Sequence, residues 1–263
     1  KVRIGVGLGV RTRLNDHGYA QVVDALERLR FDSLWLSERL GGEAPDPLVA
    51  MAFAAGRTTR LKFGMSVMVL PGRNPVVLAK ELATLDFFSP GRLEVGLGAG
   101  WMASDYEAVG LPYDPPGVRI DRFVEGLRVI KGTMADGPFS FSGDHYTVTN
   151  YNGLPKPLQK PCPPVLIGGG GKRVLSIAAR EADIVGINGT LHAGVIGTDA
   201  VATMTAAAVD EKVATALTAR VNSFAYGVDA ATRCCALTMR EAEINSIARV
   251  IFLVALTERI RRR

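Results

Sequence analysis

Short apolar runs alternate along the chain with segments whose apolar residues recur at helical spacing. The runs predict six strands, at residues 2–8, 33–37, 61–70, 92–98, 164–168 and 183–187, with a seventh near 221–228. Pairs that cap a helix, two of them with proline in the first turn, follow three of these strands: Asn15-Asp16, Asp46-Pro47 and Asn74-Pro75. Further helices are expected over residues 117–134, 172–181 and 197–219.

The strands are mostly continuous apolar runs, which is typical of parallel strands covered on both faces. About seven such strands, each followed by a helix, favour an α/β fold of the (β/α)₈ TIM-barrel type over an open doubly wound sheet. The doubly wound alternative needs a GxGxxG turn after the first strand. Gly5, Gly7 and Gly9 supply only GxGxG.

Residues 135–162 interrupt the regular pattern. Residues 139–148 alternate like a hairpin, and five prolines follow between positions 155 and 164. We expect an insertion at the barrel rim that shapes the pocket, within a single domain over residues 1–263. Beyond residue 220 the pattern is compressed, and residues 250–254 read either as an eighth strand or as a core-facing piece of helix. The sequence therefore leaves two alternatives for how the barrel closes at its C-terminal end.

Composition narrows the class of protein. Of the 263 residues, 48% are hydrophobic and 22% charged, which supports a sizeable core and excludes general disorder. No run approaches the roughly 18 apolar residues of a membrane span, and the N-terminus shows no signal-peptide pattern. We therefore expect a cytoplasmic protein with no membrane partner.

Charge and cysteine content exclude further classes. The net charge is +5, but only 7% of residues are aromatic, so the sequence does not indicate nucleic-acid binding, and small anionic ligands remain compatible. Three cysteines, two of them adjacent, predict neither a disulfide framework nor a zinc site. Three scattered histidines give metal chemistry little support, so no metal is expected.

Chemistry in such barrels lies at the carboxyl ends of the strands. The fifth strand ends in four glycines, residues 168–171, followed by Lys172 and Arg173 at the start of a helix. Glycines let the backbone approach a phosphate closely, and free N–H groups at a helix start point toward it. The run predicts an anion site; the alternative is a flexible turn.

Other strand ends offer weaker candidates. Gly98 and Gly100 leave room for a flat ring system that Trp101 would wall, although Trp101 reads equally as a packed rim residue. Glu38 and Arg39 would bind a polar substrate or carry a proton; they read equally as a solvated ion pair. The chain shows no GxSxG, Walker lysine loop or carboxylate cluster, so its chemistry has to come largely from a bound cofactor.

The run from Leu61 to Trp101 resembles the luciferase-like oxidoreductases, most of all the branch that uses the deazaflavin coenzyme F-420. The resemblance rests on combined motifs: residues 70–75 (LPGRNP), 79–86 (AKELATLD), 89–94 (SPGRLE) and 96–101 (GLGAGW), with 119–127 and 164–171. It implies a TIM barrel with the cofactor's ring at the mouth and its phosphate on Gly169, Gly170, Gly171, Lys172 and Arg173. It also implies a non-proline cis peptide bond beneath the ring, here Ser66–Val67 beside Met65.

The chain departs from this family at three positions in two motifs. Many relatives have Asp-His where this chain has Glu38-Arg39, and the sugar-phosphate dehydrogenase relatives carry glutamate in place of Trp101. The sugar-phosphate substrate of those relatives is therefore not expected for this chain.

The resemblance implies hydride transfer between coenzyme F-420 and an unknown small molecule, with Glu38 as proton carrier and Met65 and Trp101 lining the ring site. The alternatives are an FMN-dependent monooxygenase and a cofactor-binding protein without turnover. A homodimer is implied as well.

Overall fold

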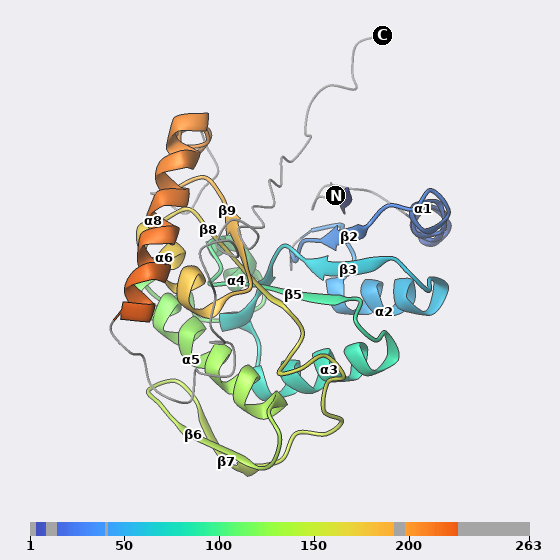
Figure 1. Cartoon of the computed structure of the whole chain (residues 1–263), viewed down its shortest axis with the longest axis horizontal. Coiled ribbons are helices and arrows are strands. Elements are labelled where there is room, and N and C mark those ends of the chain that lie inside the picture. The colour runs from blue at the N-terminus through green and yellow to red at the C-terminus, as the bar shows by residue number, and fades with distance from the viewer. Residues whose placement is uncertain (1–3, 9–14, 40–41, 192–197, 226–263) are drawn as a thin grey trace.

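The computed structural model of the chain describes residues 4–8, 15–39, 42–191 and 198–225. Seven parallel strands form one curled sheet in the order β1-β2-β3-β5-β8-β9, with β4 paired to β5 (Figure 1). The strands are β1 Gly5–Leu8, β2 Ser33–Leu36, β3 Lys62–Met65, β4 Met68–Val69, β5 Leu93–Gly98, β8 Val165–Gly169 and β9 Ile184–Ile187. The described part of the chain is thus a half-barrel of the expected α/β type.

Helices cover the outside of this sheet. The covering helices are α1 Asp16–Arg28, α2 Pro47–Arg57, α3 Pro75–Phe88, α5 Pro116–Met134, α6 Lys172–Glu181 and α8 Ala206–Ala225. The short helices α4 Ala103–Ala108 and α7 Thr198–Ala202 lie in the connections that follow β5 and β9, and a 3₁₀ turn, η1, lies at Leu70–Gly72. Three predicted caps are confirmed, because the side chains of Asn15, Asp46 and Asn74 accept N–H groups of the first helical turn.

Alternation along the strands separates two apolar clusters. The main core lies under the helices and takes one set of strand residues, among them Leu34, Leu36, Phe63, Met65, Leu93, Val95, Leu97, Val165 and Ile167. Trp35, Leu166 and Ile184 form a second cluster on the inner face, with Val67 packed against it. Residues on neighbouring strands therefore face the barrel interior at a known register.

Two strand predictions are corrected. The run expected over residues 61–70 divides into β3, β4 and η1, because the chain turns at residues 66–67. The prediction of a seventh strand near residues 221–228 is wrong over residues 221–225, because α8 continues through them and leaves Val221 61% exposed. Of residues 221–225 only Val221 is β-branched, so the alanine-rich helix before it extends through them at little cost. Residues 226–228 and the possible strand at 250–254 lie outside the described residues.

The insertion contains the expected hairpin, β6 Phe139–Ser142 and β7 Thr147–Tyr151. Its position differs from our expectation. Gln159 donates to Asp86 at the end of α3 and to the carbonyl oxygen of Leu93, the first residue of β5 (2.7 and 2.9 Å). A helix-to-strand connection lies at the amino ends of the strands, whereas chemistry lies at their carboxyl ends. The described contacts therefore place the insertion opposite the predicted pocket.

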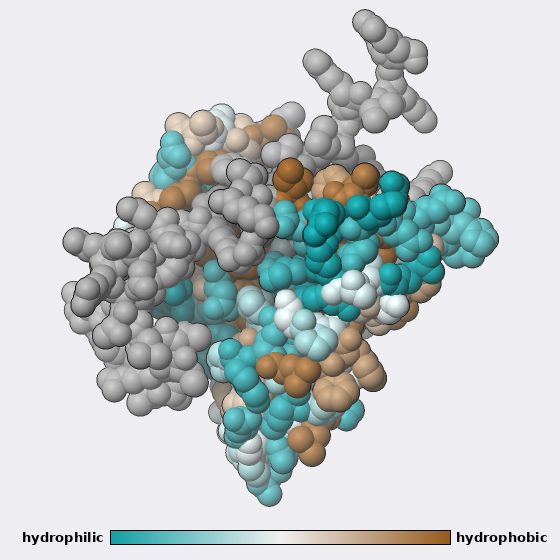
Figure 2. All heavy atoms as spheres, turned by 45° about the vertical axis from the view of Figure 1, so that its right-hand side comes forward, coloured by the Kyte–Doolittle hydropathy of each residue, from teal (hydrophilic) through white to brown (hydrophobic). Residues whose placement is uncertain are grey.

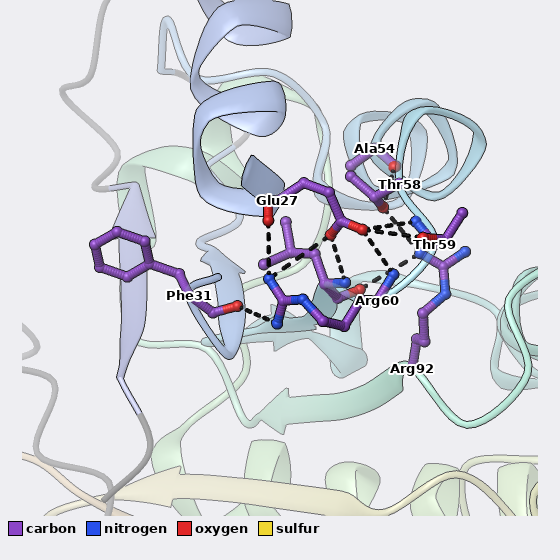
Figure 3. Close-up of polar contacts among 8 residues, drawn as sticks. Glu27, Phe31, Ala54, Thr58, Thr59, Arg60 and Arg92 are labelled. Carbon is purple, nitrogen blue, oxygen red and sulfur yellow. Dashed lines mark hydrogen bonds and ion pairs between the residues drawn. The ribbon is translucent and has the colours of Figure 1, made fainter. Parts of the chain in front are cut away.

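A polar network ties the helices to the same amino end (Figure 3). Glu27 on α1 accepts the N–H groups of Thr59, Arg60 and Leu61, just before β3, at 2.8–3.1 Å. Burial acts to raise the pKa of Glu27, but these N–H groups outweigh it and lower that pKa. Arg92, which precedes β5, donates to Thr58 Oγ1 at 2.8 Å. The network orients two strand starts and leaves the carboxyl ends free for chemistry.

Hydrophilic and hydrophobic side chains mix on the face shown in Figure 2, and the hydrophobic ones form separate groups. α2 and α3 expose large apolar side chains: Val49, Phe53, Val77, Phe87 and Phe88. Among the helices that the structure describes, none is both long and apolar enough to cross a bilayer.

Candidate functional site

The connection between β3 and β4 lies at the carboxyl edge of the sheet and contains the cis peptide bond Ser66–Val67, as the family resemblance implied. Neighbouring β2 holds it at three points. Ser66 N–H donates to the carbonyl oxygen of Leu36 (2.7 Å), and Ser37 Oγ donates to that of Ser66 (2.8 Å). Glu38 N–H donates to the carbonyl oxygen of Val67 (3.3 Å). The end of β2 therefore positions this connection.

The Val67 side chain occupies space that two glycines leave on neighbouring strands. A Cβ at Gly98 on β5 would lie 2.5 Å from Val67 Cγ2, and one at Gly168 on β8 would lie 3.2 Å from Cγ1. A Cβ at Gly96 would overlap the carbonyl oxygen of Met65. The glycines expected to leave room for a ring thus first accommodate residues 65–67. Val67, which covers the buried Gly98, and the partly exposed Gly168 form an apolar surface at the mouth.

Glu38 is nearly enclosed, with 4% of its side chain exposed. Its Oε2 accepts the N–H of Val69 (2.5 Å), and its Oε1 accepts the Nε of Arg73 (2.9 Å) and a second, shorter bond from Arg73 Nη2. Arg73 also reaches Asp46 at 2.8 Å. Burial works to lower the pKa of Arg73, but the two carboxylates outweigh it and raise that pKa. Both oxygens of Glu38 are therefore engaged in holding the chain that follows Val67.

The glycine-rich turn after β8 leads directly into α6. At Gly171 an added Cβ would meet no atom within 4 Å, so the start of α6 is open. Lys172 is exposed there. Arg173 donates to the carbonyl oxygen of Gly117 (3.3 Å) and pairs with Asp121, both on α5. A helix start with open space and a cation suits an anion, whereas Arg173 already has a carboxylate partner.

The segment after β5 forms a packed polar wall. Tyr113 Oη donates to the carbonyl oxygen of Trp101 (2.8 Å), and the buried Arg119 stacks over the Tyr113 ring at 4.0 Å. Arg119 also donates to the carbonyl oxygen of Gly100 (3.3 Å). Arg39 pairs with Asp105 at 2.9 Å. Trp101 and Arg39 are thus held by residues 100–119, which covers one side of the site.

Tyr106 belongs to the same wall and has a buried hydroxyl with no hydrogen-bond partner in the described residues. Its Oη lies against Gly100, where the backbone φ is +71°. Burial raises the pKa of Tyr106 to about 12. The hydroxyl therefore stays protonated at neutral pH.

The structure brings some of the predicted residues together. The side chain of Val67 lies against Gly98 and Gly168. Gly168 is part of β8, which leads into the glycine-rich turn. Met65 is fully buried in the main core, so only its main chain faces the 96–98 segment. The roles of all these residues stay predictions.

Sequence reasoning did not assign a role to Arg73, although the motif at residues 70–75 contains it. Asn188, which follows β9, adds a polar group beside this surface, since its Nδ2 would lie 3.3 Å from a Cβ placed at Gly168. Within the described residues no group of three His, Cys, Asp or Glu side chains is arranged to hold a metal ion. The arrangement suits a flat ring with an attached phosphate.

Comparison with known proteins bears on the family of the chain. The sequence profile described as luciferase-like monooxygenase matches residues 6–246. An FMNH(2)-dependent dimethylsulfone monooxygenase of Pseudomonas putida is 33% identical over 172 residues, covering 65% of this chain and 46% of that protein. An F420-dependent glucose-6-phosphate dehydrogenase of Kineococcus radiotolerans is 32% identical over 164 residues, covering 60% and 48%. The chain thus spans about half the length of the curated relatives it matches.

Solved structures share the fold. The monooxygenase RslO1 from Streptomyces bottropensis aligns with a TM-score of 0.71 and 21% identity, covering 85% of this chain and 67% of that one. An F420-dependent secondary alcohol dehydrogenase, in complex with an F420-acetone adduct, aligns at 0.69 and 22%, covering 83% and 65%. At these identities the likeness establishes the fold.

Proposed function

Because the chain belongs to the luciferase-like monooxygenase family, we propose that it binds coenzyme F-420 and transfers hydride between that cofactor and a small organic substrate. One observation carries the proposal. The apolar surface of Val67, Gly98 and Gly168 lies at the same strand edge as the open start of α6. A flat ring and an anionic side chain, joined in one molecule, would use both.

The residues present fit such a group. The ring would rest on Val67, and the N–H groups at Gly170, Gly171 and Lys172 would hold its phosphate, with the Lys172 ammonium adding charge. Trp101, fixed by Tyr113, would wall the site on one side. When bound, F-420 supplies the hydride chemistry. The chain itself orients the ring, excludes water from its lower face and leaves the other face to a substrate.

Two roles for Glu38 can be told apart. As the proton carrier, Glu38 would exchange a proton with substrate. As a positioning residue, Glu38 would hold Val69 and Arg73 and so fix the position of Val67 relative to the cofactor's ring. The enclosed carboxylate and its three hydrogen bonds support the second role. Arg39 is proposed to act beside it on polar substrate groups.

The variants Glu38→Gln and Arg73→Gln separate these roles. A positioning role predicts that both weaken cofactor binding and turnover similarly and leave the pH profile of turnover unchanged in shape. Loss of one limb of the pH profile in Glu38→Gln alone would establish the proton-carrier role instead.

A second candidate is a flavin-dependent monooxygenase. The dimethylsulfone enzyme that matches this chain at 33% identity is named FMNH(2)-dependent, which favours it. FMN offers the same combination of flat ring and phosphate, so the described residues fit it as well.

Titration of the purified protein with F-420 and with FMN tests the proposal. Saturable quenching of the cofactor's fluorescence identifies the ligand, and tryptophan emission from Trp35 and Trp101, the two tryptophans of the chain, provides a second signal. Trp101→Phe should change the tryptophan signal on binding, whereas Trp35→Phe, on the inner face below Val67, serves as its matched comparison. Absence of saturable binding by either cofactor contradicts the redox function. Binding without hydride exchange or oxygen use supports a binding protein without turnover.

We further propose a homodimer in the cytoplasm. The apolar side chains that α2 and α3 expose support self-association, and the three cysteines suit a reducing compartment. Sedimentation equilibrium should give twice the chain mass, and Phe53→Ser together with Phe88→Ser should shift it toward the monomer. A monomeric wild type contradicts the dimer.

A further inference from the structure

α8 carries a buried lysine that the proposed function does not use. Lys212 is 8% exposed, and its Nζ donates to the carbonyl oxygens of Asn188 and Thr203, each at 2.8 Å. Burial lowers the pKa of Lys212, and the neighbouring Glu211 opposes that effect. Among the described residues no carboxylate forms an ion pair with Lys212. Burying an ammonium on carbonyl oxygens alone is costly, and an anion nearby would offset part of that cost.

Asn188 follows β9 and Thr203 follows α7, and both are linked to the backbone of the glycine-rich turn. Thr203 Oγ1 accepts the N–H of Thr190 (2.8 Å), and Thr190 Oγ1 donates to the carbonyl oxygen of Gly170 (3.1 Å). Asn188 N–H donates to the carbonyl oxygen of Gly169 (3.0 Å). The Lys212 ammonium therefore holds the backbone at residues 188 and 203, and this backbone holds the glycine-rich turn.

The contact between the two segments is direct. A Cβ at Gly170 would lie 2.5 Å from the carbonyl oxygen of Asn188, the same atom that accepts from Lys212, and would overlap that of Gly189. The positive charge thus lies immediately behind the glycine-rich turn, separated from it by one layer of backbone. At such short range a charge in the protein interior still acts strongly on an anion.

We propose that Lys212 is a positioning residue for the phosphate of the bound cofactor. It fixes the segment at residues 188–190 against Gly169 and Gly170, and its charge adds to the field at the start of α6. The inference rests on the proposed function, since it assumes a phosphate-bearing cofactor at this turn. It adds to that function a residue 40 positions beyond Lys172, on a different helix.

FMN and riboflavin, which differ only by the terminal phosphate, make the test. Lys212→Met should weaken FMN binding about tenfold, the effect of one interior charge at about 10 Å, and change riboflavin binding less than about twofold. Lys212→Gln, which keeps a donor but removes the charge, should behave in the same way, and Lys212→Arg should retain most of the affinity for FMN. Equal losses for FMN and riboflavin would reduce Lys212 to a structural role and overturn the proposal.

Lys156 is the matched control. Its Nζ also donates to two carbonyl oxygens, those of Thr133 (3.1 Å) and Gly137 (3.3 Å), but it belongs to the insertion opposite the site. Lys156→Met should leave the ratio of FMN to riboflavin affinity unchanged. A similar change of the ratio in this variant would show that the effect is not specific to Lys212.

Inorganic phosphate provides a readout without cofactor. At constant ionic strength, it should raise the melting temperature of the wild type and of Lys156→Met more than that of Lys212→Met. A wild type that neither responds to phosphate nor prefers FMN to riboflavin refutes the phosphate site and the Lys212 proposal together. A wild type that shows the preference while Lys212→Met keeps it refutes the Lys212 proposal alone.

Discussion

Replacing Glu38 by glutamine should destabilise the folded protein through the contacts that hold the β3–β4 connection. The carboxylate is 4% exposed and accepts bonds from Val69 N–H and from Arg73, whose side chain is 24% exposed. Breaking a fully buried ion pair costs about 3–5 kcal/mol, because one charge is left unpaired. Here Arg73 keeps Asp46 at 2.8 Å, so we expect a loss of about 2–3 kcal/mol.

Urea denaturation at neutral pH measures this loss, and a double-mutant cycle assigns it. In the background of Arg73→Gln, the Glu38→Gln change should cost about 1 kcal/mol, leaving a coupling energy of about 1–2 kcal/mol. Asp46→Asn is the control: it removes a carboxylate from the same guanidinium, but Asp46 is 40% exposed, so the expected cost is below about 1 kcal/mol.

Two results would refute this reasoning. A cost of Glu38→Gln below about 0.5 kcal/mol would mean that the carboxylate does not hold the connection. Additive costs for Glu38→Gln and Arg73→Gln would mean that the two side chains act independently despite their short contact. In either case the positioning role proposed for Glu38 would lose its support.

Three further predictions concern other parts of the fold. Gly96→Ala should cost more than about 4 kcal/mol, because its Cβ overlaps the main chain of Met65, while Gly56→Ala, which meets no atom within 4 Å, should be neutral or stabilising; similar melting temperatures for the two would contradict this. Tyr106→Phe should stabilise the fold by about 1 kcal/mol, because it removes an unpartnered buried hydroxyl. Tyr19→Phe should destabilise it by a similar amount, since Tyr19 Oη donates to the carbonyl oxygen of Ala50. Changes of the same sign in the free energy of unfolding, measured by urea denaturation, would disprove this. Glu27→Gln should cost about 1–2 kcal/mol of the free energy of unfolding at pH 7. Because folding lowers the pKa of Glu27, the difference between variant and wild type is complete above the ordinary pKa of 4.5 and disappears as the pH falls through the lowered pKa. A difference that persists at pH 2 would argue against the mechanism.

Much of the architecture follows from the sequence because it depends on neighbours in the chain. Continuous apolar runs, helical spacing and caps such as Asn15 and Asn74 act over a few residues, so they predicted the places of β1, β2, β3, β5, β8 and β9 and of the capped helices α1 and α3. Alanine-rich propensity favoured the last helix strongly enough to extend it through Val221, where a strand was expected. The glycine-rich turn before Lys172 was visible for the same local reason.

The composition of the site depends on contacts between distant positions. Glu38 meets Arg73 across 35 positions, and Lys212 meets Asn188 across 24. No periodicity reports such pairs, because they follow from how the sheet curls and which strands become neighbours. The side on which residues 135–162 lie follows instead from the order of elements, because a connection from a helix to a strand lies at the amino ends of the strands.

The sequence by itself therefore determined the alternation of strands and helices, the helix starts and a family whose motifs lie in residues 61–101. Only the tertiary structure decided that Gly96 and Gly98 accommodate Met65 and Val67, and that Glu38 holds the chain beyond them. The physical reason is one of range. Propensity and hydrophobic pattern act through adjacent residues, whereas steric fit and the pairing of buried charges act between strands whose register exists only after folding.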